Sequence, residues 1–169
     1  ACDVRTCCNF EVRHALQEMQ ALGADFTIAC PAFPENGRTV FKGHLFVGDL
    51  LLSDSPMRQH PLTPMTDANL VRVMQAQCRT RRVGLIERAV VARGAPAVRE
   101  RMRVLREEGV SFAVADAIAD DDLRVLAAAA DQIGQTLEQD RLRADSTSAE
   151  LARRSDAMKS ALLDSVSHD

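Results

Sequence analysis

The sequence contains no tryptophan and no tyrosine, and phenylalanine alone supplies its 4% of aromatic residues. Stacking surfaces for bases and cages for ammonium groups need such side chains, so the composition disfavours both. Charge is nearly balanced, because 21 Lys and Arg residues stand against 24 Asp and Glu residues, giving a net charge of -3. Nucleic acids and anionic membranes require a basic surface. We therefore expect no nucleic-acid partner.

Long apolar runs and nucleotide motifs are also missing from the 169 residues. No stretch of 18 consecutive apolar residues occurs, which predicts no membrane-spanning helix and no membrane partner. Neither G-x-x-x-x-G-K-[ST] nor G-x-G-x-x-G is present. The sequence thus shows no recognisable binding site for nucleotide phosphates.

Cysteine is present in an odd number, with three of the five near the start: Cys2, Cys7, Cys8, Cys30 and Cys78. This pattern is not a disulfide framework, and it lacks the second cysteine pair typical of zinc sites. We expect a reduced, cytoplasmic location and no metal site. Because the sequence starts at Ala1 without Met or a signal pattern, we interpret it as a piece of a longer or processed chain.

Proline, phenylalanine and glycine divide the chain unevenly. The last proline is Pro96, the last phenylalanine is Phe112, and only Gly134 follows Gly109 among the glycines. Helices tolerate these residues poorly, whereas turn-rich domains need them. The sequence predicts a mixed domain over residues 1–122 and a long helix or coiled-coil-like tail over 123–169.

Helical and extended patterns alternate through the first part. The expected elements are a helix over 10–22, a strand over 25–30, two strands or a hairpin over 39–47, a helix N-capped by Asp67 and ending near Gln77, a strand over 82–87, a helix over 95–108, a strand over 111–116 and a helix from about Asp120. Such alternation predicts an α/β fold, with a parallel or mixed sheet and covering helices, followed by the long C-terminal helix. Ligands bind at the carboxyl ends of strands in these sheets, next to Cys30 and Asp116 here.

The loop after Cys30 holds the candidate binding residues Pro34, Glu35, Asn36, Gly37 and Arg38. Arg38 can bind a carboxylate or phosphate through two hydrogen bonds, and its neighbours Glu35 and Asn36 can bind hydroxyls. Gly37 permits a left-handed backbone. A rigid structural turn is the alternative.

Two further features have a structural and a functional interpretation. His44 lies in an apolar strand, where it can bind a substrate or simply be hydrogen-bonded in place. The segment from Ser53 to Asp67 holds three prolines, so it is no regular element and is either functional or disordered.

Three stretches resemble the N-terminal domain of four-carbon acid sugar kinases, most closely the 3-oxo-tetronate kinase group. They are GADFTIACPAFPENGRTVFKGHLFV (23–47), SPMRQHPLTPMTDANL (55–70), and FAVADA with DDLR (112–117 and 121–124). The resemblance implies a domain that binds a sugar acid, partnered by a second domain that supplies ATP and Mg²⁺. It also implies that the Cys30–Arg38 loop and His44 face the substrate, with Arg38 binding its carboxylate.

The sequence departs from that family in two ways. The expected acidic D-D-x-T-G loop and the glycine-rich nucleotide domain are both missing. We therefore expect no ATP or Mg²⁺ site in this chain, identify no catalytic residue, and predict that the chain is inactive without its nucleotide-binding domain.

The tail resembles sensor histidine kinases. Residues 123–142 are similar to the last helix of a GAF-type domain, and MKSALLDSVSHD (158–169) is similar to the start of the phosphoacceptor helix. That resemblance implies that His168 accepts a phosphoryl group, and the two resemblances together suggest a chimera joined near residues 121–130. A signalling segment and a non-catalytic scaffold, either of which dimerises through its C-terminal helix, are therefore the alternative functions.

Overall fold

A computed structural model describes residues 26–61, 64–78, 81–131, 139, 142–143, 145–150 and 153. The chain divides into two compact units, residues 1–130 and residues 131–169. The predicted helix over 10–22 and the residues Cys2, Cys7, Cys8 and His168 lie outside the described residues.

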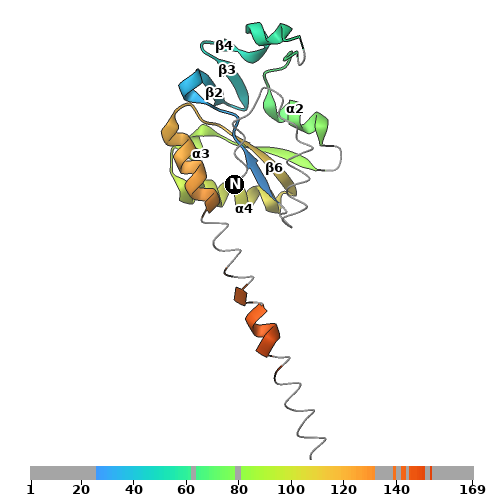
Figure 1. Ribbon diagram of the computed structural model, residues 1–169, viewed down its shortest axis with the longest axis vertical. Helices are drawn as coiled ribbons and strands as arrows, with labels where there is room; N and C mark the ends of the chain where they lie inside the picture. Colours follow the sequence, from blue (N-terminus) through green and yellow to red (C-terminus); the bar gives the residue numbers. More distant parts are fainter. Residues whose placement is uncertain are drawn as a thin grey trace, which may run out of the picture. The chain divides into compact units, whose positions relative to one another are not determined.

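Three parallel strands form the central sheet of the first unit, in the order β1-β6-β5 (Figure 1). The strands are β1 (Thr27–Ala29), β5 (Arg82–Ile86) and β6 (Val110–Ala115). The middle strand β6 is almost continuously apolar and buried, as expected for a parallel strand covered on both faces. The predicted α/β class, with a parallel sheet and covering helices, is confirmed.

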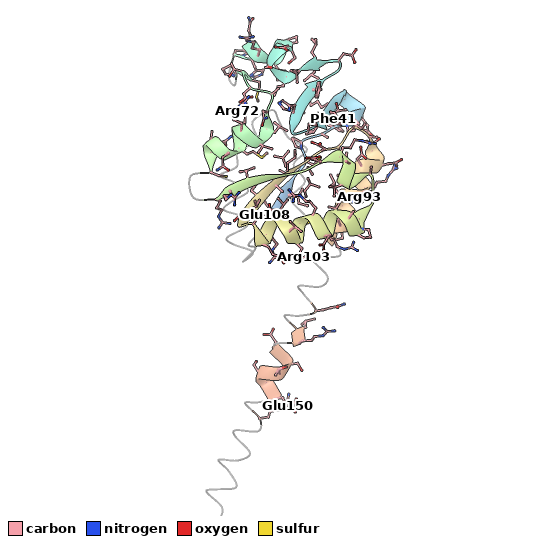
Figure 2. The ribbon with its side chains drawn as sticks, turned by 180° about the vertical axis from the view of Figure 1, so that it is seen from behind. Phe41, Arg72, Arg93, Arg103, Glu108 and Glu150 are labelled. Atoms are coloured by element: carbon pink, nitrogen blue, oxygen red, sulfur yellow. The ribbon has the colours of Figure 1, made fainter. Side chains whose placement is uncertain are left out.

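Helix α4 (Ala95–Glu107) connects β5 to β6 and buries Val98, Met102 and Leu105 against the sheet. A Cβ atom at Gly84 would lie 2.9 Å from Leu105 Cδ2, so a larger residue at this position in β5 would force the Leu105 side chain to shift. The outer face of α4 is charged. Figure 2 shows Arg103 on this face, where it pairs with Glu100 and Glu107.

A second sheet is antiparallel and consists of β2 (Arg38–Phe41), β3 (His44–Val47) and β4 (Leu50–Leu51). Lys42 and Gly43 form a two-residue turn with φ angles of 49° and 72°. Positive φ at both positions suits the twist of a tight hairpin. Of the two arrangements expected for residues 39–47, the hairpin is the one observed.

The two sheets are joined directly after β6. Val40 N–H donates to the Ala117 carbonyl at 2.8 Å, and Ala117 N–H donates to the Val40 carbonyl at 3.0 Å. The hairpin therefore lies at the carboxyl end of the parallel sheet, with α2 (Leu70–Gln77) beside it in Figure 1. One core fills this junction: Ala29, Val40, Leu45, Leu52, Ala68, Leu70, Met74, Cys78, Phe112 and Val114.

Several short elements differ from the sequence-based expectation. The N-cap of α2 is Asn69 rather than Asp67, because the Asn69 side chain accepts from Arg72 N–H at 2.9 Å. The short helix α3 (Arg88–Val91) was not expected. The proline-rich segment contains three-residue and four-residue 3₁₀ turns, η2 (Leu52–Asp54) and η3 (Pro56–Gln59). Beyond β6, residues 120–131 and 145–150 are helical, and most of the predicted tail helix lies outside the described residues.

Candidate functional site

Asp116 directly follows β6 and is fully buried. Its Oδ1 accepts from Gly43 N–H at 2.8 Å, and its Oδ2 accepts from Lys42 N–H at 2.8 Å and Arg88 N–H at 3.0 Å. A buried carboxylate needs such partners, because an unpaired buried charge is costly. The carboxylate is thus committed to backbone groups: it holds the hairpin turn and the start of α3 at the sheet edge.

The turn held by Asp116 determines the position of His44. His44 Nδ1 lies 2.9 Å from the Lys42 carbonyl oxygen, which can only accept, so Nδ1 donates. Nε2 is then the acceptor, and Asn69 Nδ2 donates to it at 3.3 Å. These two contacts fit the tautomer of His44 that carries its proton on Nδ1.

A second network orders the start of α2. Asp67 Oδ1 accepts from Asn69 N–H at 2.9 Å and from Arg72 Nη2 at 2.6 Å, while Oδ2 accepts from Arg72 Nε at 2.6 Å. The double hydrogen bond from Arg72 holds the pKa of the Asp67 carboxyl below its usual range. Asp67 therefore stays ionised at neutral pH and fixes the guanidinium of Arg72.

The two networks meet in an open cleft of about 390 Å³. Its lining residues come from β3, β4, η2, the segment that leads into α2 and α2 itself: His44, Leu51, Ser53, Thr66, Asp67, Ala68, Asn69 and Arg72. This volume falls in the usual range of roughly 300–1,000 Å³ for small-molecule sites. Figure 2 labels Arg72, which comes from α2. Because most lining side chains are polar, the cleft suits a small polar ligand.

The predicted loop residues lie elsewhere on the hairpin. Pro34, Glu35 and Asn36 form the 3₁₀ turn η1, which Gly37 closes with a φ of 69°. Phe33 and Arg38 exchange backbone hydrogen bonds of 2.8 and 3.1 Å across this turn. The side chains of Glu35 and Asn36 are exposed.

Arg38 and His44 are not brought together. Arg38 pairs with Val47 at one end of the hairpin, and His44 pairs with Phe41 at the other, about 10 Å away along the strands. Since side chains alternate along a strand, Arg38 and His44 also project from opposite faces. Of the predicted binding residues, only His44 lines the cleft.

The cleft residues Ser53, Thr66, Asp67, Asn69 and Arg72 were not predicted as site residues. The available signal was the spacing D-x-N-x-x-R over Asp67–Arg72, an Asx turn followed by an N-cap and an arginine at the third helical position. Helix capping alone explains the first two residues, so the pattern points to a site only together with the fold, which places Arg72 in the same cleft as His44.

Metal and thiol chemistry find little support in the described residues. Among them, no group of three His, Cys, Asp or Glu side chains could hold a metal ion. Cys30 follows β1, and burial raises the pKa of its thiol to about 12, helped by the nearby charges of Asp116 and Asp122. The Cys30 thiol therefore stays protonated at neutral pH and is a poor nucleophile. None of the described helices is long and apolar enough to cross a membrane.

Together, the parallel sheet with its terminal hairpin and the polar cleft define an α/β domain suited to a small polar ligand. The chain belongs to the family of sugar-binding N-terminal domains, which matches residues 13–153. The predicted resemblance to a sugar-binding N-terminal domain is thereby confirmed.

Two 3-oxo-tetronate kinases and one solved structure are similar to this chain. The chain is 62% identical over 111 residues to a 3-oxo-tetronate kinase of Pseudomonas fluorescens, covering 66% of this chain and 26% of the relative. It is 62% identical over 108 residues to a 3-oxo-tetronate kinase of Cupriavidus necator, covering 64% and 25%. A crystal structure of a Haemophilus influenzae protein matches with a TM-score of 0.65 and 49% identity, covering 70% of this chain and 28% of that one. The chain thus spans about a quarter of the length of these relatives.

Proposed function

We propose that this chain is the substrate-binding portion of an ATP-dependent kinase that phosphorylates a four-carbon sugar acid of the 3-oxo-tetronate type. The observation that carries the proposal is the 62% identity over 111 residues to a 3-oxo-tetronate kinase. The polar cleft beside His44 supports it, because a tetronate offers several hydroxyls and one carboxylate to such a lining.

The chain's proposed part in the reaction is to bind and orient the sugar acid. Phosphoryl transfer depends on positioning and on neutralising the charge of the phosphates, for which ATP-dependent kinases use Mg²⁺. The sequence contains no recognisable motif for nucleotide phosphates, so we assign neither ATP nor Mg²⁺ to the described residues. We propose that a separate nucleotide-binding domain supplies both, and that this chain alone transfers no phosphate.

His44 is the residue we propose to contact a substrate hydroxyl. Its Nε2 accepts from Asn69 at 3.3 Å, which is long for a hydrogen bond between neutral groups. A hydroxyl that enters the cleft can donate to Nε2 at shorter range. The Pro34–Arg38 turn is the alternative contact that the sequence predicted, in which Arg38 at the other end of the hairpin would bind the carboxylate in place of a cleft residue.

Thermal unfolding of the complete chain tests this function. Tetronates and their 3-oxo derivatives are compared with uncharged tetritols of the same length. A ligand at 100 times its Kd stabilises the folded state by about 2.7 kcal/mol, which raises the midpoint by several degrees. We expect this rise with four-carbon acids, and a loss of it in His44→Ala. A chain that melts cooperatively and responds to no four-carbon acid contradicts the proposed function.

A further inference from the structure

We infer that Arg72, held in place by Asp67, binds the carboxylate of the sugar acid and so selects acids over uncharged sugars. This inference rests on the proposed function and names a specificity residue within it. It differs from the sequence-based expectation, which gave that role to Arg38.

The argument begins with the hydrogen-bond donors of Arg72. A guanidinium carries five N–H groups, and Asp67 approaches it from the side, where it accepts from Nε at 2.6 Å and from Nη2 at 2.6 Å. The two N–H groups of Nη1 and the outer N–H of Nη2 remain. In the described part of the chain, no acceptor engages these three groups.

The remaining donors form the end of the guanidinium fork. This end presents two parallel N–H groups, the arrangement that matches the two oxygens of a carboxylate. The Arg72 side chain is 69% exposed, and it lines the cleft together with Asp67 and His44. A ligand can therefore reach the fork from the open side of the cleft.

Asp67 acts as a positioning residue for this contact. Arginine side chains lose much rotamer entropy when they bind, and an arginine already fixed by two hydrogen bonds loses less. The backbone N–H of Asn69 donates to the same carboxylate, so Asp67 is itself anchored to the start of α2. The Arg72 fork is thus preorganised at the cleft rim before any ligand arrives.

The remaining lining completes a site for a hydroxy acid. Ser53, Thr66 and the His44 ring supply hydroxyl and imidazole groups within the same cleft as the Arg72 fork. Hydroxyls of a four-carbon acid have partners there once its carboxylate is bound. Arg38, by contrast, lies at the far end of the hairpin on its other face and does not line the cleft.

A phosphate could use the same fork, so the test must separate the two anions. Isothermal titration of the complete chain compares a tetronate, the matching tetritol and inorganic phosphate. The variants are Arg72→Ala, Arg72→Lys and Arg38→Ala. Arg103→Ala is the matched control, because Arg103 is also exposed and paired with a carboxylate but lies on α4, away from the cleft.

We expect Arg72→Ala to weaken tetronate binding about tenfold or more, the usual effect of losing a charge-assisted fork. Binding of the tetritol should change less than about twofold. Arg72→Lys should restore part of the affinity, since it keeps the charge and loses the fork. Arg38→Ala and Arg103→Ala should bind the tetronate like the parent chain.

Other outcomes overturn the inference in distinguishable ways. Loss of tetronate binding in Arg38→Ala with retention in Arg72→Ala returns the role to Arg38 and leaves the proposed function standing. If the parent chain binds tetronate and tetritol equally well, the inferred contact between Arg72 and the carboxylate is wrong. It is also wrong if Arg72→Ala weakens the binding of phosphate but not that of tetronate. Absence of any tetronate binding by the parent chain refutes the proposed function as well. If Arg72→Ala does not fold, Arg72→Lys provides the test. A preference of Arg72→Lys for tetronate over tetritol as strong as that of the parent chain would contradict a carboxylate contact through the two parallel N–H groups of Arg72.

Discussion

At the scale of single residues, Asp116 and Asp67 show that aspartate has two different roles in this domain. Asp116 is fully buried and gives its oxygens to three backbone N–H groups, so it organises the hairpin. Asp67 is partly exposed and gives its oxygens mainly to one guanidinium, so it orients a group that a ligand can reach. The two aspartates differ in burial and in the groups that they bind, which makes Asp116 an anchor for the hairpin and Asp67 a positioning residue for Arg72.

Replacement of the Asp116 carboxylate by an amide tests its role as anchor. In Asp116→Asn an amide NH₂ group replaces one carboxylate oxygen and faces backbone N–H groups, which thereby lose their acceptor. Each buried N–H group left without an acceptor lowers the folding stability by about 1–3 kcal/mol. We expect the midpoint of urea unfolding to fall accordingly. Asp121→Asn serves as control, because Asp121 is 87% exposed and its pairing with Arg124 lies on the surface. Equal midpoints for the two variants would show that Asp116 does not hold the hairpin.

The sequence alone did not predict which individual side chains line the cleft. Of the predicted binding residues, His44 lies in the cleft, and its contact with a ligand stays a prediction. The position of Arg38 depends on strand register, since a shift of one residue moves a side chain to the other face. No local pattern fixes that register before the turn at Lys42 and Gly43 is known.

At the scale of elements, the alternation of strands and helices was sufficient to predict the fold class. The strands β1, β5 and β6 and the helix α4 all lie within a few residues of the predicted ranges. Helix α3 was missed because four residues are too few to show a helical period. Its start depends on a distant partner, the Asp116 carboxylate that accepts from Arg88 N–H.

The hairpin turn provides an element-scale prediction. In Gly43→Ala the new Cβ meets Val71 Cγ2 at 3.2 Å and Leu85 Cδ1 at 3.4 Å, and the φ of 72° is unfavourable as well. We expect a loss of folding free energy beyond the roughly 1–2 kcal/mol of the left-handed conformation alone. Gly48→Ala is the matched control, since Gly48 has a φ of 60° and no atom within 4 Å of the new Cβ. Equal losses measured by urea unfolding would show that packing of the turn against α2 and β5 contributes nothing.

At the scale of the whole molecule, the cleft is formed by residues that are far apart in the sequence and that the fold brings together. His44 comes from the hairpin, Ser53 from η2 and Arg72 from α2, and the carboxyl end of the parallel sheet holds the hairpin in place through Asp116. The sequence predicted a ligand next to Cys30 and Asp116 at the sheet edge, whereas neither of these two residues lines the cleft. The relatives are about four times longer than the matched segment, in keeping with a proposed division between a sugar-acid domain and a nucleotide domain.

Titration of the isotope-labelled chain with a 3-oxo-tetronate, followed by NMR of the backbone amides, tests the central claim most directly. The account predicts saturable shifts at His44, Asn69 and Arg72, with the amides of α4 near Glu100 unchanged, and no comparable shifts with the uncharged tetritol. Well-dispersed spectra that do not respond to the acid would contradict the claim that this chain binds the substrate. Saturable shifts confined to Glu35–Arg38 would place the substrate at the other end of the hairpin and contradict the assignment of the cleft.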